Sequence, residues 1–449
     1  MNPDLAIFSK RVFVNGELKP ATIFIKSGKI LDLTDGLAQP PDCKFIDAGN
    51  DIVMPGLIDA HVHINEPGRT EWEGFYTGTM AAAAGGITTI VDMPLNSSPV
   101  TTTPEAFELK LAAAKDKVHV NCGFWGGIVP ENVNDLEPLL KSGVLGIKSF
   151  LVHSGIDEFK NTSIKNLKSA LPLLAKYNLP LLVHCELELD NPAAKLLDEQ
   201  PQSYSAYLKS RPKRWENEAI DALIEICWDL PTKIHIVHLS SSEALPAIRL
   251  ARRTGLPISV ETCPHYLYFD EENIPDGNPL YKCAPPIREM ANNELLWRAL
   301  ENNLIDFIAS DHSPAPANVK QLDSKNLKTA WGGIAGLQFS LPVIWTAAKK
   351  RGATIADMVK WLSANPATFL NLDHRKGKLE TGYDADLVIW DPDAAFVLKK
   401  EMVHHRHKIS PYIGENFCGL VKQTFVNGHK VFDDGQFFNL NQGEIILNK

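Results

Sequence analysis

Short apolar runs alternate with longer helical patterns through the middle of the chain, between about residues 55 and 375. Apolar runs bounded by turn residues are typical of buried strands, whereas apolar positions three and four apart are typical of helices. The pattern predicts eight strands: Gly56–His61, Thr88–Met93, Val118–Phe124, Leu145–Phe150, Pro180–His184, Ile234–His238, Ile258–Glu261 and Asp306–Asp311. Helical stretches separate most of them, such as Thr77–Gly85, Glu216–Trp228 and Ser242–Arg253. Eight alternating units of this kind predict an α/β fold, a parallel (β/α)₈ barrel.

Both ends of the chain have a different pattern, with short strands and tight turns. Near the start, Arg11–Val14 leads into Asn15-Gly16, and near the end Gln423–Val426 leads into Asn427-Gly428. Asn-Gly between apolar runs is a strong hairpin signal. We therefore expect a small composite β-sandwich built from both termini. The predicted parts are residues 1–54 and 376–449 for this domain and 55–375 for the barrel.

Composition excludes several classes of protein. Hydrophobic residues make up 44% and charged residues 22% of the 449 residues, which is typical of a globular chain and not of a disordered one, a fibre or a coiled coil. The net charge of −9 gives no reason to expect nucleic acid or an anionic membrane as a partner. There is no apolar stretch near 18 residues, no apparent signal peptide and no CxxC pair among seven cysteines, so we expect a cytoplasmic protein with reduced thiols and no membrane span.

Polar residues of one chemical type gather at the ends of the predicted strands. In a barrel of this kind, active sites lie at the carboxyl ends of the strands. The side chains that should converge there are His61, His63, Lys148, His184, His238 and Asp311. A single histidine after an apolar strand is more often a core residue, but four of them favour a metal site. His61 and His63 are two residues apart and so point to the same side, where both can bind one ion.

Lys148 is the unusual member of this group, because an ammonium is repelled by metal ions. Its amine could react with CO₂ to form a carbamate, whose two oxygens could bridge two metals as carboxylates do. Alternatively, Lys148 could form an ion pair with Glu186 or Asp311. Spacing alone leaves both interpretations open.

Several motifs resemble those of the cyclic amidohydrolases, the family of dihydroorotase, hydantoinase and allantoinase. They are Pro55–His63, Gly146–Phe150, Ser310–His312 and the stretch from Gly377 to Val388. The similarity extends over nearly the whole chain. It implies a binuclear zinc site with a carboxylated Lys148, in which His61, His63, Lys148 and Asp311 hold one metal and Lys148, His184 and His238 the other. Such ligands also accept Co, Mn or Fe. The family further implies a homo-oligomer, a tetramer or a dimer.

The resemblance also implies a mechanism. A hydroxide between two divalent cations is a nucleophile near neutral pH. Asp311 would take its proton and deliver it to the departing ring nitrogen, as general base and then general acid. A lone aspartate at the end of a strand is more often a cap, but the position of Asp311 beside the predicted metal ligands favours a catalytic role.

The substrate is predicted from the residues that follow His63. Dihydroorotases have an arginine two residues later to bind the substrate carboxylate, whereas this chain has Asn65, which favours a neutral ring. The segments Asn65–Phe75 and Asp92–Ser97 resemble the allantoinase branch, which implies hydrolysis of allantoin to allantoate. The alternatives are a hydantoinase or dihydropyrimidinase, a dihydroorotase, and a metal-free scaffold. Glu66, Arg69 and Glu73 could instead form a surface ion cluster.

Six further residues are candidates for substrate contact, each with structural packing as the alternative role. They follow predicted strands or lie in loops beside them: Asn96, His265, Ile287, Asn292, Ser313 and Gly333. Gly333 belongs to the glycine-rich stretch Trp331–Gly336, which could bring backbone close to a ligand. That stretch lacks the Lys-Ser/Thr of a phosphate-binding P-loop.

Overall fold

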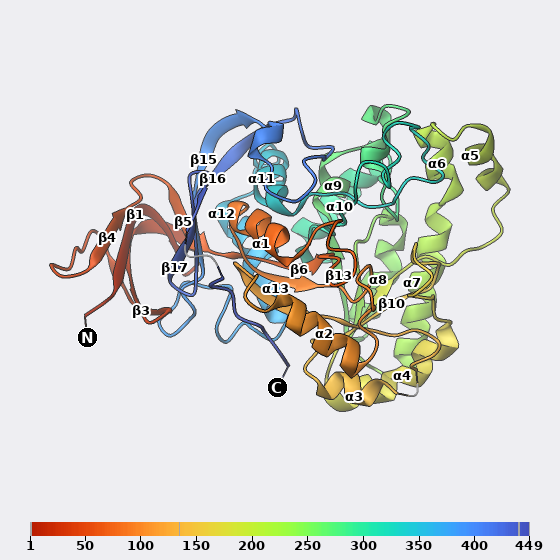
Figure 1. Cartoon of the computed structure of the whole chain (residues 1–449), viewed down its shortest axis with the longest axis horizontal. Coiled ribbons are helices and arrows are strands. Elements are labelled where there is room, and N and C mark those ends of the chain that lie inside the picture. The colour runs from red at the N-terminus through yellow and green to blue at the C-terminus, as the bar shows by residue number, and fades with distance from the viewer. Residues whose placement is uncertain (1, 134, 439–440, 449) are drawn as a thin grey trace.

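The middle of the chain forms a closed parallel barrel (Figure 1). The computed structural model describes residues 2–133, 135–438 and 441–448. The barrel strands follow one another in chain order: β6 (Leu57–Val62), β7 (Ile87–Asp92), β8 (Asn121–Phe124) continued by β9 (Gly126–Gly127), β10 (Ile147–Phe150), β11 (Leu181–His184), β12 (Ile234–Ile236), β13 (Ile258–Thr262) and β14 (Phe307–Ile308). A parallel bridge between Val62 and His312 links the last strand region to the first. The predicted barrel is confirmed.

Helices surround the barrel and follow most of its strands (Figure 1). The described α-helices are α1 (Phe75–Ala84), α2 (Pro104–Ala114), α3 (Leu136–Lys141), α4 (Ile164–Tyr177), α5 (Lys195–Glu199), α6 (Tyr204–Ser210), α7 (Lys213–Asp229), α8 (Leu245–Arg253), α9 (Pro264–Tyr268), α10 (Met290–Glu301), α11 (Ser340–Lys349), α12 (Ile355–Val359) and α13 (Asn365–Phe369). The sequence sets where several begin. Ser163 and Asn166 form a capping box at the start of α4, and Thr103 caps α2 ahead of Pro104.

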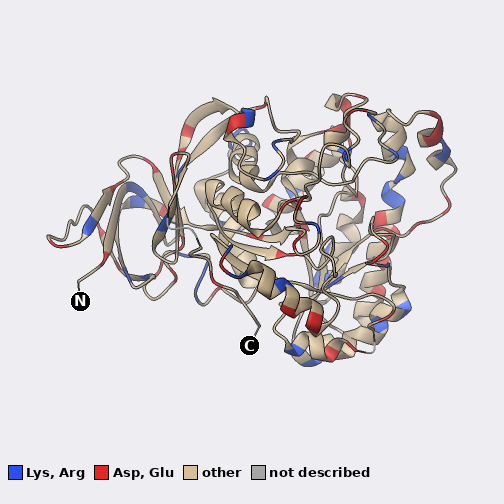
Figure 2. Cartoon of the chain, in the orientation of Figure 1, with Lys and Arg blue, Asp and Glu red and all other residues tan. Residues whose placement is uncertain are grey.

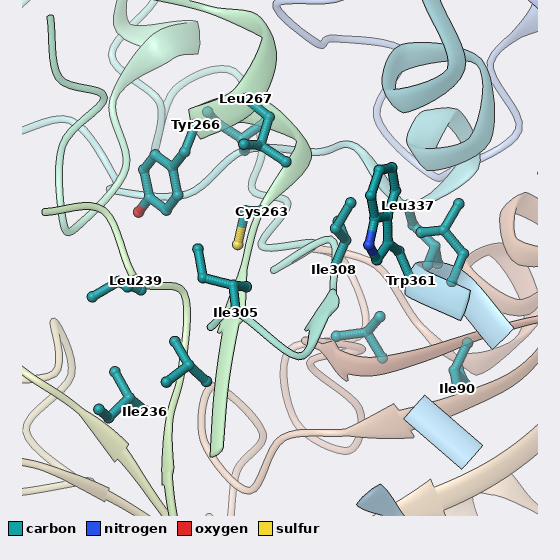
Figure 3. Packing of buried hydrophobic residues seen from close by; sticks show 14 of the residues in the cluster. Ile90, Ile236, Leu239, Cys263, Tyr266, Leu267, Ile305, Ile308, Leu337 and Trp361 are labelled. Atoms are coloured by element: carbon teal, nitrogen blue, oxygen red, sulfur yellow. The ribbon is translucent and has the colours of Figure 1, made fainter. Parts of the chain in front are cut away.

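Alternate residues of the strands pack into two different apolar clusters. On β11, Leu181 and Val183 belong to a large cluster between strands and helices, whereas Leu182 belongs to a smaller cluster inside the barrel. This follows from the two-residue repeat of a strand. Figure 3 shows part of the larger cluster, with Ile308 and Trp361 among its members. Because both faces of the strands are buried, the barrel holds the strand ends rigidly around one mouth.

The two ends of the chain share one sheet beside the barrel (Figure 1). Its strands are β1 (Leu5–Val14), β2 (Glu17–Lys26), β3 (Lys29–Asp35), β4 (Lys44–Asp47), β5 (Ile52–Pro55), β15 (Leu387–Val397), β16 (Asn416–Val426), β17 (His429–Asp433) and β18 (Gln436–Phe437). Strand β5 pairs with β15, which joins the N-terminal part to the C-terminal part. The predicted composite β domain is confirmed, while its boundaries at residues 54 and 375 stay predictions.

Both predicted Asn-Gly hairpins are confirmed. Val14 pairs with Glu17 across Asn15-Gly16, and Val426 pairs with His429 across the second turn. Asn15 and Gly16 have φ values of 52° and 89°, the left-handed conformation that a tight two-residue hairpin requires.

The last described residues leave this sheet and return to the barrel. Ile445 bridges Cys122 of β8, and the backbone N–H of Ile446 donates to the carbonyl of Cys122 at 2.9 Å. The side chain of Ile446 is buried in the cluster inside the barrel. The C-terminal segment therefore contributes to the core of the barrel.

Charged residues of both signs are interspersed over the surface elements (Figure 2). Among the residues that the structure describes, no helix combines the length and the apolar character needed to cross a membrane.

Candidate active site

The carboxyl ends of the barrel strands open onto a cavity of about 480 Å³. Five of the six predicted metal ligands line it: His61, His63, His184, His238 and Asp311. They come from the ends of four different strand regions, as the barrel architecture predicts. Lys148 of β10 lies nearby in full burial, with its Nζ 5.0 Å from the centre of the Phe150 ring. Phe150 in turn stacks on His184, which lines the cavity.

Pairs of these side chains lie within about hydrogen-bonding distance of each other. Nε2 of His61 and Nε2 of His63 lie 3.2 and 3.3 Å from Oδ1 of Asp311. Nδ1 of His184 lies 3.0 Å from Nε2 of His238. His61, His238 and Asp311 each offer a ligand atom within 4.8 Å of the other two. Residues from distant parts of the chain thus form one compact donor cluster.

Two members of the cluster have an unusual backbone conformation. His238 has a φ of 39° and Asp311 a φ of 45°, in the left-handed region that residues other than glycine rarely adopt. Such strained residues persist only where the surrounding structure holds them, and they gather at functional sites. The barrel therefore directs these two side chains into the mouth at a cost in backbone energy.

Among the described residues, the buried Nζ of Lys148 has no hydrogen-bond partner. Burial lowers the pKa of this lysine to about 8. No ion pair joins it to Glu186 or Asp311 among the described residues, and Glu186 instead binds His184 and Arg211. A buried amine that titrates near neutral pH and donates no hydrogen bond is available for reaction with CO₂, as one interpretation of the sequence requires.

Glu261 orients the first histidine of the cluster. This buried residue of β13 accepts a hydrogen bond from Nδ1 of His61, and its other oxygen lies 3.1 Å from Nε2 of His235. The ring of His61 is thereby fixed with Nε2 toward Asp311. Glu261 was predicted only as the end of a strand, with no role in the site. The signal that could have indicated one is an acidic residue at the end of a short strand with no other charge.

Glu186 orients another histidine in the same way. Its Oε2 lies 2.7 Å from Nε2 of His184, and Arg211 binds both carboxylate oxygens. Although burial raises the pKa of Glu186, the charge of Arg211 and the hydrogen bond of His184 lower it to about 2. The carboxylate is therefore ionised and leaves Nδ1 of His184 facing His238.

This donor set fits divalent metal ions. Histidines that bind metals commonly donate their second ring N–H to a carboxylate, as His61 and His184 do here. In addition, Nδ1 of His238 and Nζ of Lys148 are buried and have no hydrogen-bond partner in the part of the chain that is described. A metal ion and a carboxylated lysine would satisfy these polar atoms, which are otherwise costly to bury.

Two of the predicted substrate-binding residues lie on the wall of the cavity. Asn96 lines it, and its Nδ2 lies 3.3 Å from Nδ1 of His63. Ser313 also lines it, two residues beyond Asp311. Both can offer a hydrogen bond to a molecule inside.

The other four candidates lie behind this wall and do not line the cavity in the part of the chain that is described. Asn292 accepts a hydrogen bond from the N–H of Ser242 and donates to the carbonyl of Ser240. The carbonyl of Ile287 accepts from the hydroxyl of a tyrosine. A Cβ on Gly333 would lie only 2.5 to 2.6 Å from the backbone oxygen and the side chain of Ser313, and both ring nitrogens of His265 are buried without a partner among the described residues. A direct role of these four stays a prediction.

In the segment after His63, Glu66 and Glu73 are buried, whereas Arg69 is partly exposed. Glu66 accepts a hydrogen bond from the N–H of Phe75, and Glu73 contacts the ring of His312. Arg69 pairs with Glu158 at 2.6 Å. These three residues therefore bind different partners and do not form one surface ion cluster.

The chain is similar to known proteins in both sequence and fold. The model of the amidohydrolase family matches residues 52–431. An allantoinase of Arabidopsis thaliana is 45% identical over 96% of this chain and 88% of its own length. An allantoinase of Streptomyces avermitilis is 44% identical over 97% of this chain and 96% of its own. The solved structure of an L-hydantoinase (dihydropyrimidinase) from Arthrobacter aurescens superposes with a TM-score of 0.93 at 30% identity, covering 99% of both chains.

The fold and the donor cluster define a metal-dependent cyclic amidohydrolase. The chain belongs to the amidohydrolase family and, within it, to the allantoinases.

Proposed function

We propose that this protein binds two divalent metal ions, with zinc as the expected metal, and hydrolyses the hydantoin ring of allantoin to allantoate. The observation that carries the proposal is the cluster of His61, His63 and Asp311 at the barrel mouth, with Nε2 of both histidines within 3.3 Å of Oδ1 of Asp311. The identity of 45% to an allantoinase supports the choice of substrate.

The ligands divide into two sets that share one residue. His61, His63, Asp311 and carboxylated Lys148 would hold one ion, and Lys148, His184 and His238 the other. The carbamate forms when the neutral amine of Lys148 attacks CO₂ and loses a proton, so the residue becomes an anion with two oxygens. Bound metal ions supply a water of lowered pKa and polarise the carbonyl that is attacked.

Asp311 moves the proton. Burial raises its pKa, but the charges and hydrogen bonds of His61 and His63 outweigh this and hold it well below the usual range. The carboxylate is therefore ionised and faces the cavity, ready to accept a proton from the attacking water. It then gives this proton to the ring nitrogen as the C–N bond breaks, which leaves a carboxylate and a free ureido group.

The residue at position 65 favours a neutral ring. Asn65 stands where dihydroorotases have an arginine, and its side chain is buried with Nδ2 3.4 Å from the carbonyl of Pro314. Asn96 and Ser313 offer polar groups from the wall, and His265, Ile287, Asn292 and Gly333 complete the proposed substrate-binding set. An uncharged substrate rich in amide groups, such as allantoin, matches these neutral donors and acceptors.

A hydantoinase is the second candidate. It is favoured by the similarity in structure to the L-hydantoinase, with a TM-score of 0.93. Allantoin is itself a hydantoin with a ureido group on the ring, so both reactions need the same metal cluster. The residues of the cavity wall would then decide which of the two substrates is bound.

The test is ring opening of allantoin, hydantoin and dihydroorotate in parallel by metal-loaded protein. We expect allantoin to be hydrolysed with a kcat/KM well above those of the other two. Asp311→Asn should keep most of the metal and lose all but a small residual rate of ring opening. A higher kcat/KM for hydantoin would move the protein to the second candidate, and no turnover by metal-loaded protein would refute the substrate assignment.

A homo-oligomer remains part of the proposal because the resemblance favours it, and the predicted cytoplasmic location remains a proposal. Sedimentation equilibrium of the purified protein would show whether it forms a dimer or a tetramer, and cell fractionation would test the location.

A further inference from the structure

We infer that Glu73 and His312 form a buried pair that positions Asp311, an inference that rests on the proposed role of Asp311. Glu73 lies just before α1, whereas His312 directly follows Asp311. Oε2 of Glu73 lies 3.3 Å from Nε2 of His312, and both residues are completely buried. Neither of them lines the cavity. They are therefore positioning residues and not groups that touch the substrate.

Backbone contacts fix which nitrogen of His312 carries the proton. Nδ1 lies 3.2 and 3.4 Å from the backbone nitrogens of Gly336 and Leu337, both of which donate to it. A ring nitrogen that accepts hydrogen bonds is unprotonated, so the proton of the neutral imidazole is on Nε2. Nε2–H then donates to Glu73. A flip of the imidazole ring would break the hydrogen bonds of both ring nitrogens.

The backbone of His312 transmits this fixed position to Asp311. The carbonyl of His312 accepts a hydrogen bond of 2.8 Å from the N–H of His63, and its own N–H donates to Oγ of Ser310 at 3.1 Å. Asp311 lies between these contacts with a φ of 45°. Because the ring of His312 is anchored away from the cavity, the strained backbone turns the carboxylate of Asp311 into the cavity, beside His61 and His63.

Glu73 is itself held by two other segments. Its Oε1 accepts hydrogen bonds from Oγ1 of Thr77, at 2.5 Å, and from the backbone N–H of Arg406, at 3.1 Å. Thr77 belongs to α1, and Arg406 lies between β15 and β16 in the C-terminal part of the chain. The carboxylate thus needs both oxygens as acceptors, one toward these two donors and one toward His312.

The variant Glu73→Gln tests the inference with little change in volume. An amide has one oxygen, so its NH₂ group must face either Nε2–H of His312 or the donors on the other side. We expect kcat for allantoin to fall about 10- to 100-fold, the usual loss when a partner behind the reacting groups is removed. The KM should stay within about threefold and the metal content unchanged, because Glu73 does not touch the substrate. Glu71→Gln is the matched control, since its side chain is exposed, and it should leave kcat unchanged.

The double variant Asp311→Asn with Glu73→Gln separates positioning from a general structural role. If Glu73 acts through Asp311, the double variant hydrolyses allantoin no more slowly than Asp311→Asn alone. If the second substitution lowers the residual rate by its full factor, Glu73 acts independently and the inference is wrong. An unchanged kcat for Glu73→Gln, or a loss that only follows lost metal, also overturns it.

A further variant covers the case in which Glu73→Gln does not fold. In His312→Asn the shorter side chain keeps an acceptor for the N–H groups of Gly336 and Leu337 but cannot reach Glu73, so the same fall in kcat is expected. A wild-type rate in that variant overturns the inference. Inactive wild-type protein would refute the proposed function together with this inference, whereas active wild type with unaffected variants refutes the inference alone.

Discussion

Glu261 accepts a hydrogen bond from Nδ1 of His61, although the two residues are 200 positions apart in the chain. The contact crosses the barrel mouth from β13 to β6 and leaves Nε2 of His61 facing Asp311. Burial raises the pKa of Glu261, but the charges and hydrogen bonds of His61 and His235 lower it to about 2. The ionised carboxylate therefore fixes the tautomer of His61 in which Nε2 is free to bind a metal.

Replacing Glu261 should weaken metal binding without removing a ligand. In Glu261→Gln the single amide oxygen cannot accept from both His61 and His235, so His61 loses its fixed orientation. We expect the metal affinity to fall about 10- to 100-fold. Metal titration of the apoprotein measures this, with Glu108→Gln on the exposed face of α2 as the control. Equal affinities in the two variants would show that Glu261 does not orient a ligand.

Replacing Lys148 tests whether it carries a bridging carbamate. Lys148→Ala should lose both metal ions, and a short carboxylic acid such as propionate should restore part of the metal content and the activity, because its two oxygens replace those of the carbamate. Elemental analysis and the allantoin assay, with and without the acid, measure this. Lys115→Ala, which changes an exposed lysine, is the control. Retention of both metals in Lys148→Ala without added acid would contradict a carbamate ligand.

The strands and the candidate ligands could be predicted from the sequence because both signals are local. A buried strand such as Leu181–His184 is an apolar run that ends in a histidine, and the barrel architecture then gives the direction in which that histidine points. Tight turns such as Asn15-Gly16 carry their conformation in two residues.

Partnerships between distant residues could not be predicted in this way. Glu73 was open to interpretation as part of a surface ion cluster, because its partner His312 is 239 positions away and nothing near it in sequence indicates burial. Glu186 was considered as a partner of Lys148, whereas the structure pairs it with Arg211 and His184. A carboxylate gains its role from the charges around it after folding, and these are not visible in a local pattern.

The joint between the barrel and the terminal sheet depends on ionised aspartates. Asp384 binds Arg375 at 2.7 Å and Lys376 at 2.8 Å, and Lys29 of the N-terminal part also pairs with it. Burial raises the pKa of Asp384, but Lys376, Lys29 and Arg375 outweigh burial and lower the pKa to about 2. Since the unfolded value is about 4, folding is linked to loss of this proton.

The pH dependence of stability follows from the sign of this shift. A lowered pKa in the folded state contributes stability that is present above about pH 4 and is lost as the pH falls through about 2. Asp384→Asn should therefore cost about 3 kcal/mol at pH 7, the typical cost of breaking a buried pair, and the difference from wild type should shrink below pH 4. Denaturant unfolding at several pH values measures this. Asp198→Asn, which breaks an exposed pair with Lys328, should cost under about 1 kcal/mol, and a pH-independent cost for Asp384→Asn would exclude ionisation as its cause.

The C-terminal segment should contribute to the stability of the barrel and not only to the terminal sheet. Ile446 is 5% exposed and belongs to the same apolar cluster as Leu182 and Phe307. Ile446→Ala removes buried methyl groups and leaves a cavity, so we expect a loss of about 2 to 4 kcal/mol in the free energy of unfolding. Leu250→Ala on α8 is the control, because Leu250 is 65% exposed and should cost under about 0.5 kcal/mol.

Measuring activity distinguishes a contribution of Ile446 to stability from a role in the active site. Ile446 does not line the cavity, so folded and metal-loaded Ile446→Ala should hydrolyse allantoin at the wild-type kcat. Thermal or denaturant unfolding followed by kinetics on the folded fraction checks both halves of the prediction. A loss of stability no larger than that of Leu250→Ala would mean that the segment lies against the barrel without stabilising it.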